Sequence, residues 1–160
     1  MPRPISATIS LPSLRHNLAA TAAQFDDANV SRPGPKPKIW AVIKANAYGH
    51  GIHNAVQAFE RADGLAMLDL DEAVQCRVAG WTKPILLLEG AFRAADLEVV
   101  DHYSLKATMH NAEQVAMLES ARPAAPFDVF VKLNTGMNRW GFPPPNIAMP
   151  MRASSNCART

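Results

Sequence analysis

Residues 39–51 read IWAVIKANAYGHG, and the rest of the chain can be organised around this stretch. Its apolar start is typical of a buried strand, and Lys44 closes the apolar run. A loop of small residues that includes Asn46, Tyr48 and His50 follows at once. Because charge is costly to bury, a lysine at the end of an apolar strand needs a reason. One reason is chemical, since a partly dry amine can form an imine with an aldehyde.

The composition is that of an ordinary globular protein with room for one modest domain: 160 residues, 48% hydrophobic and 19% charged. The net charge is +2, and no basic run or aromatic-interleaved patch points to nucleic acid, so we expect no nucleic-acid partner. No apolar run approaches membrane-spanning length, and the first residues lack the apolar core of a secretion signal. We therefore expect no membrane association and a cytoplasmic location.

The cysteines and histidines show no metal-ligand spacing. Cys76 and Cys157 lie far apart, and we expect both to be free thiols in a reducing compartment. We expect His50 to fix the loop rather than to bind a metal, and Asn46 to cap nearby backbone groups. The other histidines share no spacing, and we predict surface or helix-face positions for them: His16, His53, His102 and His110.

Strand-like and helix-like stretches alternate along the chain. Residues 7–10 indicate a short strand, and Ser10 is a plausible N-cap for a helix whose apolar stripe runs from Leu11 to Phe25. Residues 26–38, rich in proline at their end, indicate a loop. Beyond it we predict strands over residues 38–44, 64–68, 85–88, 104–108 and 127–133, and helices over residues 51–61, 70–79, 92–100 and 111–120.

This alternation indicates an α/β fold. Repeating βα units imply parallel strands with right-handed crossovers. Periodicity alone does not separate a doubly wound sheet from a β/α barrel. In both folds, functional groups gather at the carboxyl ends of the strands. Lys44 stands at such an end, and Arg139 follows the fifth predicted strand.

Three segments of the sequence resemble alanine racemases. Residues 42–51, VIKANAYGHG, closely resemble the family's pyridoxal-phosphate lysine signature. Residues 131–139, VKLNTGMNR, resemble its K-x-[DN]-T-G-M-x-R segment, and residues 84–90, PILLLEG, resemble a strand and its exit. The resemblance runs from about Ala7 to Phe142.

The resemblance implies a partial (β/α)8 barrel of the TIM type. Alanine racemases have such a barrel followed by a separate β-rich domain, whereas the pattern here stops after about five strands. We therefore expect residues 1–142 to be the N-terminal part of the barrel and the C-terminal β-domain to be absent. Residues 143–160 show no clear amphipathic period, and we expect them to be a divergent tail from a truncated or frameshifted reading frame.

The family's activity is the interconversion of L-alanine and D-alanine, which supplies D-alanine for the cell wall, with pyridoxal 5'-phosphate as cofactor. The resemblance implies that Lys44 binds the cofactor covalently and acts as a catalytic base on the α-proton of the D-enantiomer. It implies that the Tyr48 hydroxyl binds the cofactor phosphate. Arg139 would bind the phenolic oxygen of the cofactor and the substrate carboxylate. The plain alternatives are a strand-end lysine, a half-buried tyrosine and a solvated surface arginine.

Lys132 has two interpretations of equal weight. In many alanine racemases the matching lysine is carbamylated to N6-carboxylysine and holds the arginine in place. Carbamylation would turn a cation into an anion beside Arg139 and remove a clash between like charges. The alternative is an unmodified lysine.

Several parts of the family's site have no counterpart in this chain. The opposing base of alanine racemases is a tyrosine from the C-terminal domain of the other subunit. The resemblance implies a homodimer for full-length family members, but its contacts come from a domain that this chain does not match. We expect the isolated chain to be inactive and poorly folded, with exposed sheet edges and apolar barrel-facing side chains. The alternatives are a catalytically inactive cofactor-binding fragment, a broad-specificity amino-acid racemase, and a barrel protein that uses the cofactor for homeostasis or decarboxylation. The TGMNR segment favours a racemase over the last.

Overall fold

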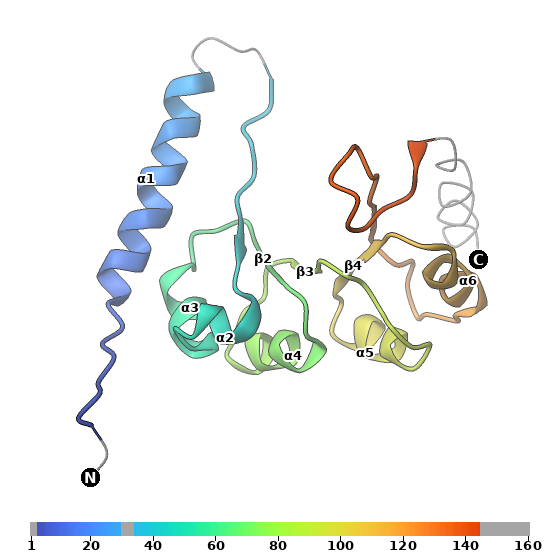
Figure 1. Cartoon of the computed structure of the whole chain (residues 1–160), viewed down its shortest axis with the longest axis horizontal. Helices are drawn as coiled ribbons and strands as arrows, with labels where there is room; N and C mark the ends of the chain where they lie inside the picture. Colours follow the sequence, from blue (N-terminus) through green and yellow to red (C-terminus); the bar gives the residue numbers. More distant parts are fainter. Residues whose placement is uncertain (1–2, 30–33, 145–160) are drawn as a thin grey trace.

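Five short parallel strands form one sheet in the computed structural model, which describes residues 3–29 and 34–144 (Figure 1). The strands are β1 (Trp40–Val42), β2 (Gly64–Met67), β3 (Ile85–Leu87), β4 (Lys106–Met109) and β5 (Val129–Val131). The helices are α1 (Leu11–Asn29), α2 (Lys44–Tyr48), α3 (Ile52–Ala58), α4 (Leu70–Val78), α5 (Asp96–His102) and α6 (Ala112–Ser120).

The order of the strands is that of a barrel wall. Each strand pairs in parallel with the next one along the chain, in the order β1-β2-β3-β4-β5. A doubly wound sheet reverses its strand order at a switch point, and this sheet does not. The structure thereby decides a question that periodicity left open.

One face of the sheet packs against the helices. Leu65 and Met67 of β2 and Ile85 and Leu87 of β3 are fully buried in this core. The helices contribute small side chains, including Ala73 of α4, so that strands and helices approach closely. In Figure 1, α3, α4 and α5 lie along the same side of the strands. A sheet with its connecting helices on one side is a segment of a β/α barrel.

The opposite face curves as the inside of a barrel does. Trp40 of β1 and Phe130 of β5 come from the two edge strands, yet their ring centroids are 6.1 Å apart in an edge-to-face contact. Gly64 leaves room for the indole, because a Cβ there would lie 2.5 Å from a Trp40 ring atom. Val42 is 41% exposed and Phe130 is 46% exposed. The predicted exposure of apolar barrel-facing side chains is confirmed for these two edge strands, whereas Ala66 of β2 and Leu86 of β3 on the same face are buried.

Side-chain caps set where two of the predicted helices begin. The Asp69 carboxylate accepts hydrogen bonds from the backbone N–H groups of Asp71 and Glu72 and begins α4. The Asn111 side chain accepts the backbone N–H of Gln114 at 2.8 Å and begins α6. The helices predicted over residues 70–79 and 111–120 are therefore confirmed to within a residue.

Three local predictions were wrong. Residues 7–10 form no strand, although Ser10 does cap α1 through the backbone N–H of Ser13. Helix α1 continues to Asn29, into the segment predicted as loop. Helix α5 begins at Asp96 rather than at residue 92, because the Asp96 carboxylate accepts the backbone N–H groups of Phe92 and Arg93 and holds them in a turn. The predicted tail lies almost wholly outside the described residues.

Arg77 ties the end of α4 to the chain around β3 and β4, a role that the sequence reasoning missed. Its guanidinium donates to the carbonyl oxygens of Trp81 and Lys83 at 2.8 and 2.7 Å. It also donates to the carbonyl oxygens of Tyr103 and Ser104 at 3.0 and 3.3 Å. Burial lowers the pKa of this guanidinium. A planar fork of donors suits several carbonyl acceptors at once, which a lysine cannot match.

Cys76 provides a test of this core through pH. Its side chain is 0% exposed, and burial, reinforced by the Glu72 carboxylate and opposed by Arg77, raises the thiol pKa from 9.0 to about 11. Between these values the unfolded chain loses the thiol proton while the folded chain keeps it. The free energy of unfolding therefore falls as pH rises through this interval, by about 2–3 kcal/mol in total.

Urea unfolding at several pH values measures this loss, with the Cys76→Ala variant as control. Other groups titrate in the same interval, so the prediction concerns the difference between the two profiles. The variant is expected to lose less stability than the parent chain as pH rises. Equal losses in the two proteins would contradict the assignment.

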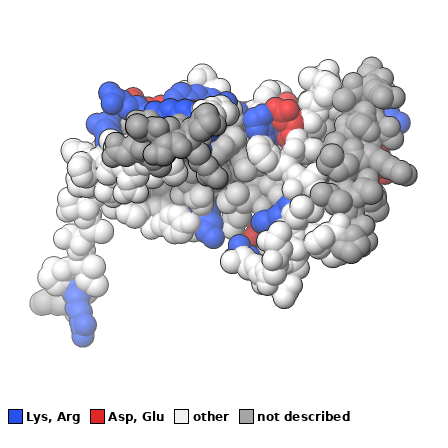
Figure 2. All heavy atoms as spheres, turned by 90° about the horizontal axis from the view of Figure 1, so that it is seen from above, with Lys and Arg blue, Asp and Glu red and all other residues white. Residues whose placement is uncertain are grey.

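Two surface features complete the description. Within residues 3–29 and 34–144, no helix combines the length and the hydropathy that a membrane span requires. Seen from above, Lys and Arg side chains gather toward one end of the molecule, with fewer acidic side chains beside them (Figure 2). The surface charge is therefore uneven, although the net charge of the chain is only +2.

Candidate active site at the carboxyl ends of the strands

Lys44 opens an unusual backbone turn at the carboxyl end of β1. Ala45, Asn46, Ala47 and Tyr48 all have φ between 52° and 54°, and Gly49 follows with φ of 82°. A left-handed conformation costs about 1–2 kcal/mol for each residue other than glycine. Residues 44–49, here called the lysine turn, are therefore strained. Such strain persists where the surrounding structure enforces it, and it is typical of functional sites.

Backbone hydrogen bonds hold the lysine turn from within. The Ala47 N–H donates to the Ile43 carbonyl and the Gly51 N–H donates to the Asn46 carbonyl, both at 2.9 Å. The Asn46 side-chain oxygen accepts the Ile52 N–H at 3.0 Å, which confirms its predicted capping role. These bonds fix the direction in which the turn leaves the strand.

Contacts with its neighbours anchor the same turn. The His50 ring donates from Nδ1 to the Ala47 carbonyl at 2.7 Å, which confirms that His50 fixes the loop. The Glu72 carboxylate of α4 accepts the Asn46 N–H at 2.5 Å. Ala47 is 4% exposed, so the turn also packs into the core. Glu72 is a residue that the sequence reasoning missed.

The two predicted ligand-binding side chains of this turn differ in exposure. Lys44, just beyond the end of β1, is a half-buried residue. Tyr48 is 58% exposed, which removes the plain alternative of a half-buried ring. Lys44 and Tyr48 stand at the two ends of one short strained turn. Their relative placement is therefore set by the conformation of this turn.

Arg139 is exposed on a loop that follows β5. This loop, residues 132–142, is closed at its base because the Phe142 N–H donates to the Lys132 carbonyl and the Asn134 N–H donates to the Phe142 carbonyl, both at 2.9 Å. The Asn134 side-chain oxygen accepts the N–H groups of Gly136 and Asn138 at 3.1 Å. We call it the arginine loop. Its backbone is tied in place while Arg139 remains available to a ligand.

His110 supports the arginine loop from beneath. Its ring centroid lies 4.6 Å from that of Trp140, the residue after Arg139. His110 is 5% exposed and donates from Nε2 to the Glu89 carbonyl at 3.0 Å, so the predicted surface position was wrong. Gln114 donates to the same carbonyl at 2.6 Å. The position of His110 immediately after an apolar strand was the signal in the sequence that could have predicted its burial.

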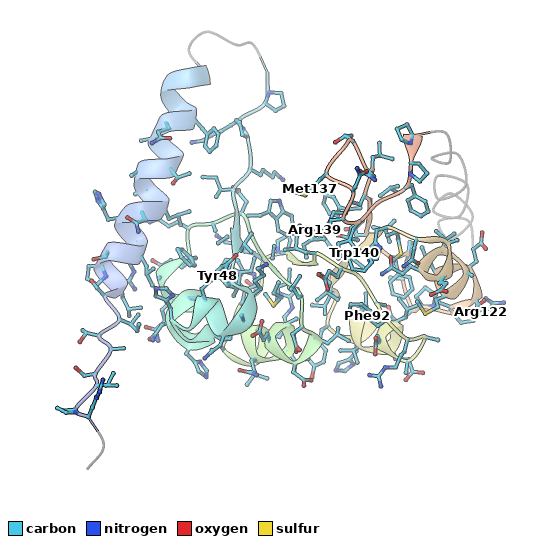
Figure 3. All side chains as sticks on the ribbon, viewed as in Figure 1. Tyr48, Phe92, Arg122, Met137, Arg139 and Trp140 are labelled. Carbon is cyan, nitrogen blue, oxygen red and sulfur yellow. The ribbon has the colours of Figure 1, made fainter. Side chains whose placement is uncertain are left out.

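The structure brings the predicted site residues to the same ends of two strands. Lys44 and Tyr48 follow β1, while Lys132 and Arg139 follow β5. Figure 3 shows Met137 and Arg139 on the side of the arginine loop that faces β1 and the lysine turn. Among the described residues, no hydrogen bond or ion pair joins Lys44 or Tyr48 to Lys132 or Arg139.

Fold and site together define the class of protein. A curved, all-parallel sheet with helices on one face is the first part of a β/α barrel, and the predicted site residues follow the carboxyl ends of its first and fifth strands. The sequence model described as "Alanine racemase, N-terminal domain" matches residues 9–158. The chain belongs to the alanine racemase family.

Individual relatives agree with this assignment. The chain is 58% identical over 144 residues to a protein of Bordetella petrii named alanine racemase, covering 90% of this chain and 38% of the relative. It is 50% identical, also over 144 residues, to the protein of Paraburkholderia phytofirmans named alanine racemase. The solved biosynthetic alanine racemase of Pseudomonas aeruginosa matches with a TM-score of 0.80 and 36% identity, over 99% of this chain and 41% of that one. The chain thus spans about two fifths of its relatives' length.

Proposed function

We propose that this chain supplies the cofactor-binding part of an alanine racemase that uses pyridoxal 5'-phosphate. The observation that supports this most strongly is the lysine turn. It places a half-buried lysine and an exposed tyrosine at the two ends of a strained backbone segment at the carboxyl end of a barrel strand. Strain of this kind is maintained where a ligand requires a particular geometry.

The donor groups present fit this cofactor. Lys44 offers an amine to the aldehyde of the cofactor, and the Tyr48 hydroxyl would donate to its phosphate. Arg139 offers a fixed fork of donors to two kinds of anionic oxygen, the phenolic oxygen of the cofactor and the carboxylate of the substrate. When bound, the cofactor supplies an electron sink for the carbanion that is left by removal of an α-proton.

The residues of this chain have separate tasks in such a reaction. Lys44 Nζ would hold the cofactor and then move the α-proton on one face of the substrate. Arg139 would orient the substrate through its carboxylate. Racemisation also needs a proton donor on the opposite face, and Lys44 serves one face alone. We therefore propose that the complete site takes this second group from elsewhere in a homodimeric protein.

The state of Lys132 is part of the proposal. This residue is partly buried at the end of β5 and begins the arginine loop. An N6-carboxylysine here would bring a negative charge to the base of the loop that presents Arg139. Electron density at Lys132 Nζ distinguishes this modification from an unmodified lysine.

The remaining proposals follow from the relatives. We infer that the substrate is alanine, that the product serves the cell wall, and that the protein works in the cytoplasm. A broader amino-acid specificity is the nearest alternative. We place the end of the barrel part near Phe142, which is 4% exposed and packs with Ala107, Met109 and Val115. Exposed Val42 and Phe130 favour a second candidate function for the chain alone, an inactive cofactor-binding fragment.

Completing the barrel tests the proposed activity. The chimera for this purpose joins residues 1–142 of this chain to the remaining part of the Bordetella petrii relative. With added cofactor it is expected to interconvert L- and D-alanine, whereas the 160-residue chain is expected to show no turnover above background, because it lacks the second base. A coupled D-alanine assay measures both. A chimera that folds but does not bind the cofactor would contradict the proposed function, and robust turnover by the chain alone would contradict the incomplete site.

A further inference from the structure

Glu72 makes an unexpected contact for its position in α4. It is the third residue of a helix whose cap is Asp69. A glutamate in this position commonly accepts the backbone N–H of the cap residue itself. Here its Oε1 instead accepts the Asn46 N–H at 2.5 Å, in the middle of the lysine turn. The helix begins without this side chain, since the Asp69 carboxylate accepts the N–H groups of Asp71 and Glu72.

The surroundings make a carboxylate at this position costly. The other oxygen of Glu72, Oε2, is buried and has no hydrogen-bond partner among the described residues. Cys76, one helical turn further on, is fully buried, so the carboxylate borders the apolar core. A buried acceptor without a donor is unfavourable for stability. The contact that Glu72 does make is therefore the best explanation for its placement.

The contact with Glu72 gives a backbone N–H of the lysine turn the acceptor that the turn itself does not supply. The first N–H groups of any helical turn lack partners within the turn, and Asn46 provides one of them. Its N–H has Glu72 as its acceptor, while its own side chain and carbonyl hold Ile52 and Gly51. Asn46 is therefore bound on both sides, and Glu72 connects it to a separate helix. An ionised acceptor makes the stronger kind of hydrogen bond.

We propose that Glu72 is a positioning residue that holds the lysine turn in its left-handed conformation, so that Lys44 and Tyr48 meet the cofactor at a set spacing. This inference rests on the proposed function for the identity of the ligand. The effect of Glu72 on the conformation of the turn is independent of the proposed function. Glu72 acts through the backbone N–H of Asn46.

Site-resolved amide hydrogen exchange, followed by NMR, tests the contact without cofactor, in both the 160-residue chain and the chimera. E72A is expected to raise exchange at the Asn46 amide by about tenfold or more, because the amide loses its acceptor. E72D keeps the charge but falls one methylene short, and it is expected to behave like E72A. E72Q keeps an acceptor at the same reach and is expected to retain most of the protection. D71A, which removes an exposed charge from the same helical turn, is the matched control.

Cofactor affinity is the second measurement, made by titrating the folded chimera. E72A and E72D are expected to weaken pyridoxal-phosphate binding by about tenfold, with E72Q and D71A close to the parent. Exchange at Asn46 that is unchanged in E72A and E72D would overturn the proposal, and so would a loss of protection in E72Q as large as in E72A. If no variant or parent binds the cofactor, the proposed function fails, while the exchange result still decides the role of Glu72.

Discussion

Replacing Lys44 by alanine is expected to abolish covalent attachment of pyridoxal phosphate to the chimera. Lys44 is a half-buried residue at the carboxyl end of β1, where the lysine turn begins. Without it, the cofactor has no amine to attach to at the mouth of the barrel. We expect loss of the visible absorbance of the bound cofactor. We also expect racemisation to fall by a factor of about 10²–10⁴ or more, because the same amine is the proposed base.

Lys38→Ala is the matched control for this prediction. Lys38 is an exposed lysine just ahead of β1 and far along the strand from the lysine turn. The variant is expected to keep the absorbance and activity of the parent. Borohydride reduction followed by peptide mapping then locates the attachment directly. A reduced adduct on another lysine of the folded chimera, or an unchanged spectrum in the Lys44→Ala variant, would contradict the assignment.

Replacing Gly90 by alanine is expected to cause the largest loss of stability of any change considered for this fold. A Cβ at Gly90 would lie 2.1 Å from the Thr108 carbonyl oxygen and 2.8 Å from Nε2 of Gln114. The first of these atoms belongs to the backbone of β4 and cannot move without breaking the strand. Gly90 also has a φ of 71°, which alanine adopts only with strain. We expect the free energy of unfolding to fall by about 3 kcal/mol or more.

Gly80→Ala separates the two causes of this loss. Gly80 has a φ of 92°, but a Cβ there would meet nothing within 4 Å. Its substitution adds backbone strain without a clash, so we expect a loss of about 1–2 kcal/mol. Urea unfolding of both variants beside the parent chain measures the difference. Similar losses at the two glycines would show that the close approach of Gly90 to β4 is not important for stability.

Much of the fold could be predicted from short-range patterns. The strands from β1 to β5 lie within a few residues of the predicted runs, because an apolar run bounded by turn residues is a local signal. The start of α5 was placed wrongly, since it depends on the Asp96 carboxylate binding the N–H groups of Phe92 and Arg93. Those bonds are a property of the folded turn and leave no mark in the hydrophobic period.

The supporting residues of the candidate site were harder to predict than the residues proposed to bind the ligand. Lys44, Tyr48 and Arg139 lie in sequence motifs that resemble those of the family, and these motifs predict a role for each of them. Glu72 and His110 do not, because each acts on a segment far away in the sequence: Glu72 binds Asn46, and the His110 ring packs on Trp140. A periodic pattern shows which face of an element is buried. It does not show which distant residue will lie against it.

The sequence by itself determined the alternation of strands and helices, and it placed Lys44 at the end of the first strand. These properties depend on residues that are neighbours along the chain. Only the tertiary structure decided that β1 to β5 pair in order and curve until Trp40 meets Phe130. It alone showed the left-handed lysine turn and the Glu72 carboxylate that binds it. A strained backbone is stable where distant groups supply its hydrogen bonds, and distance in sequence hides those groups until the chain is folded.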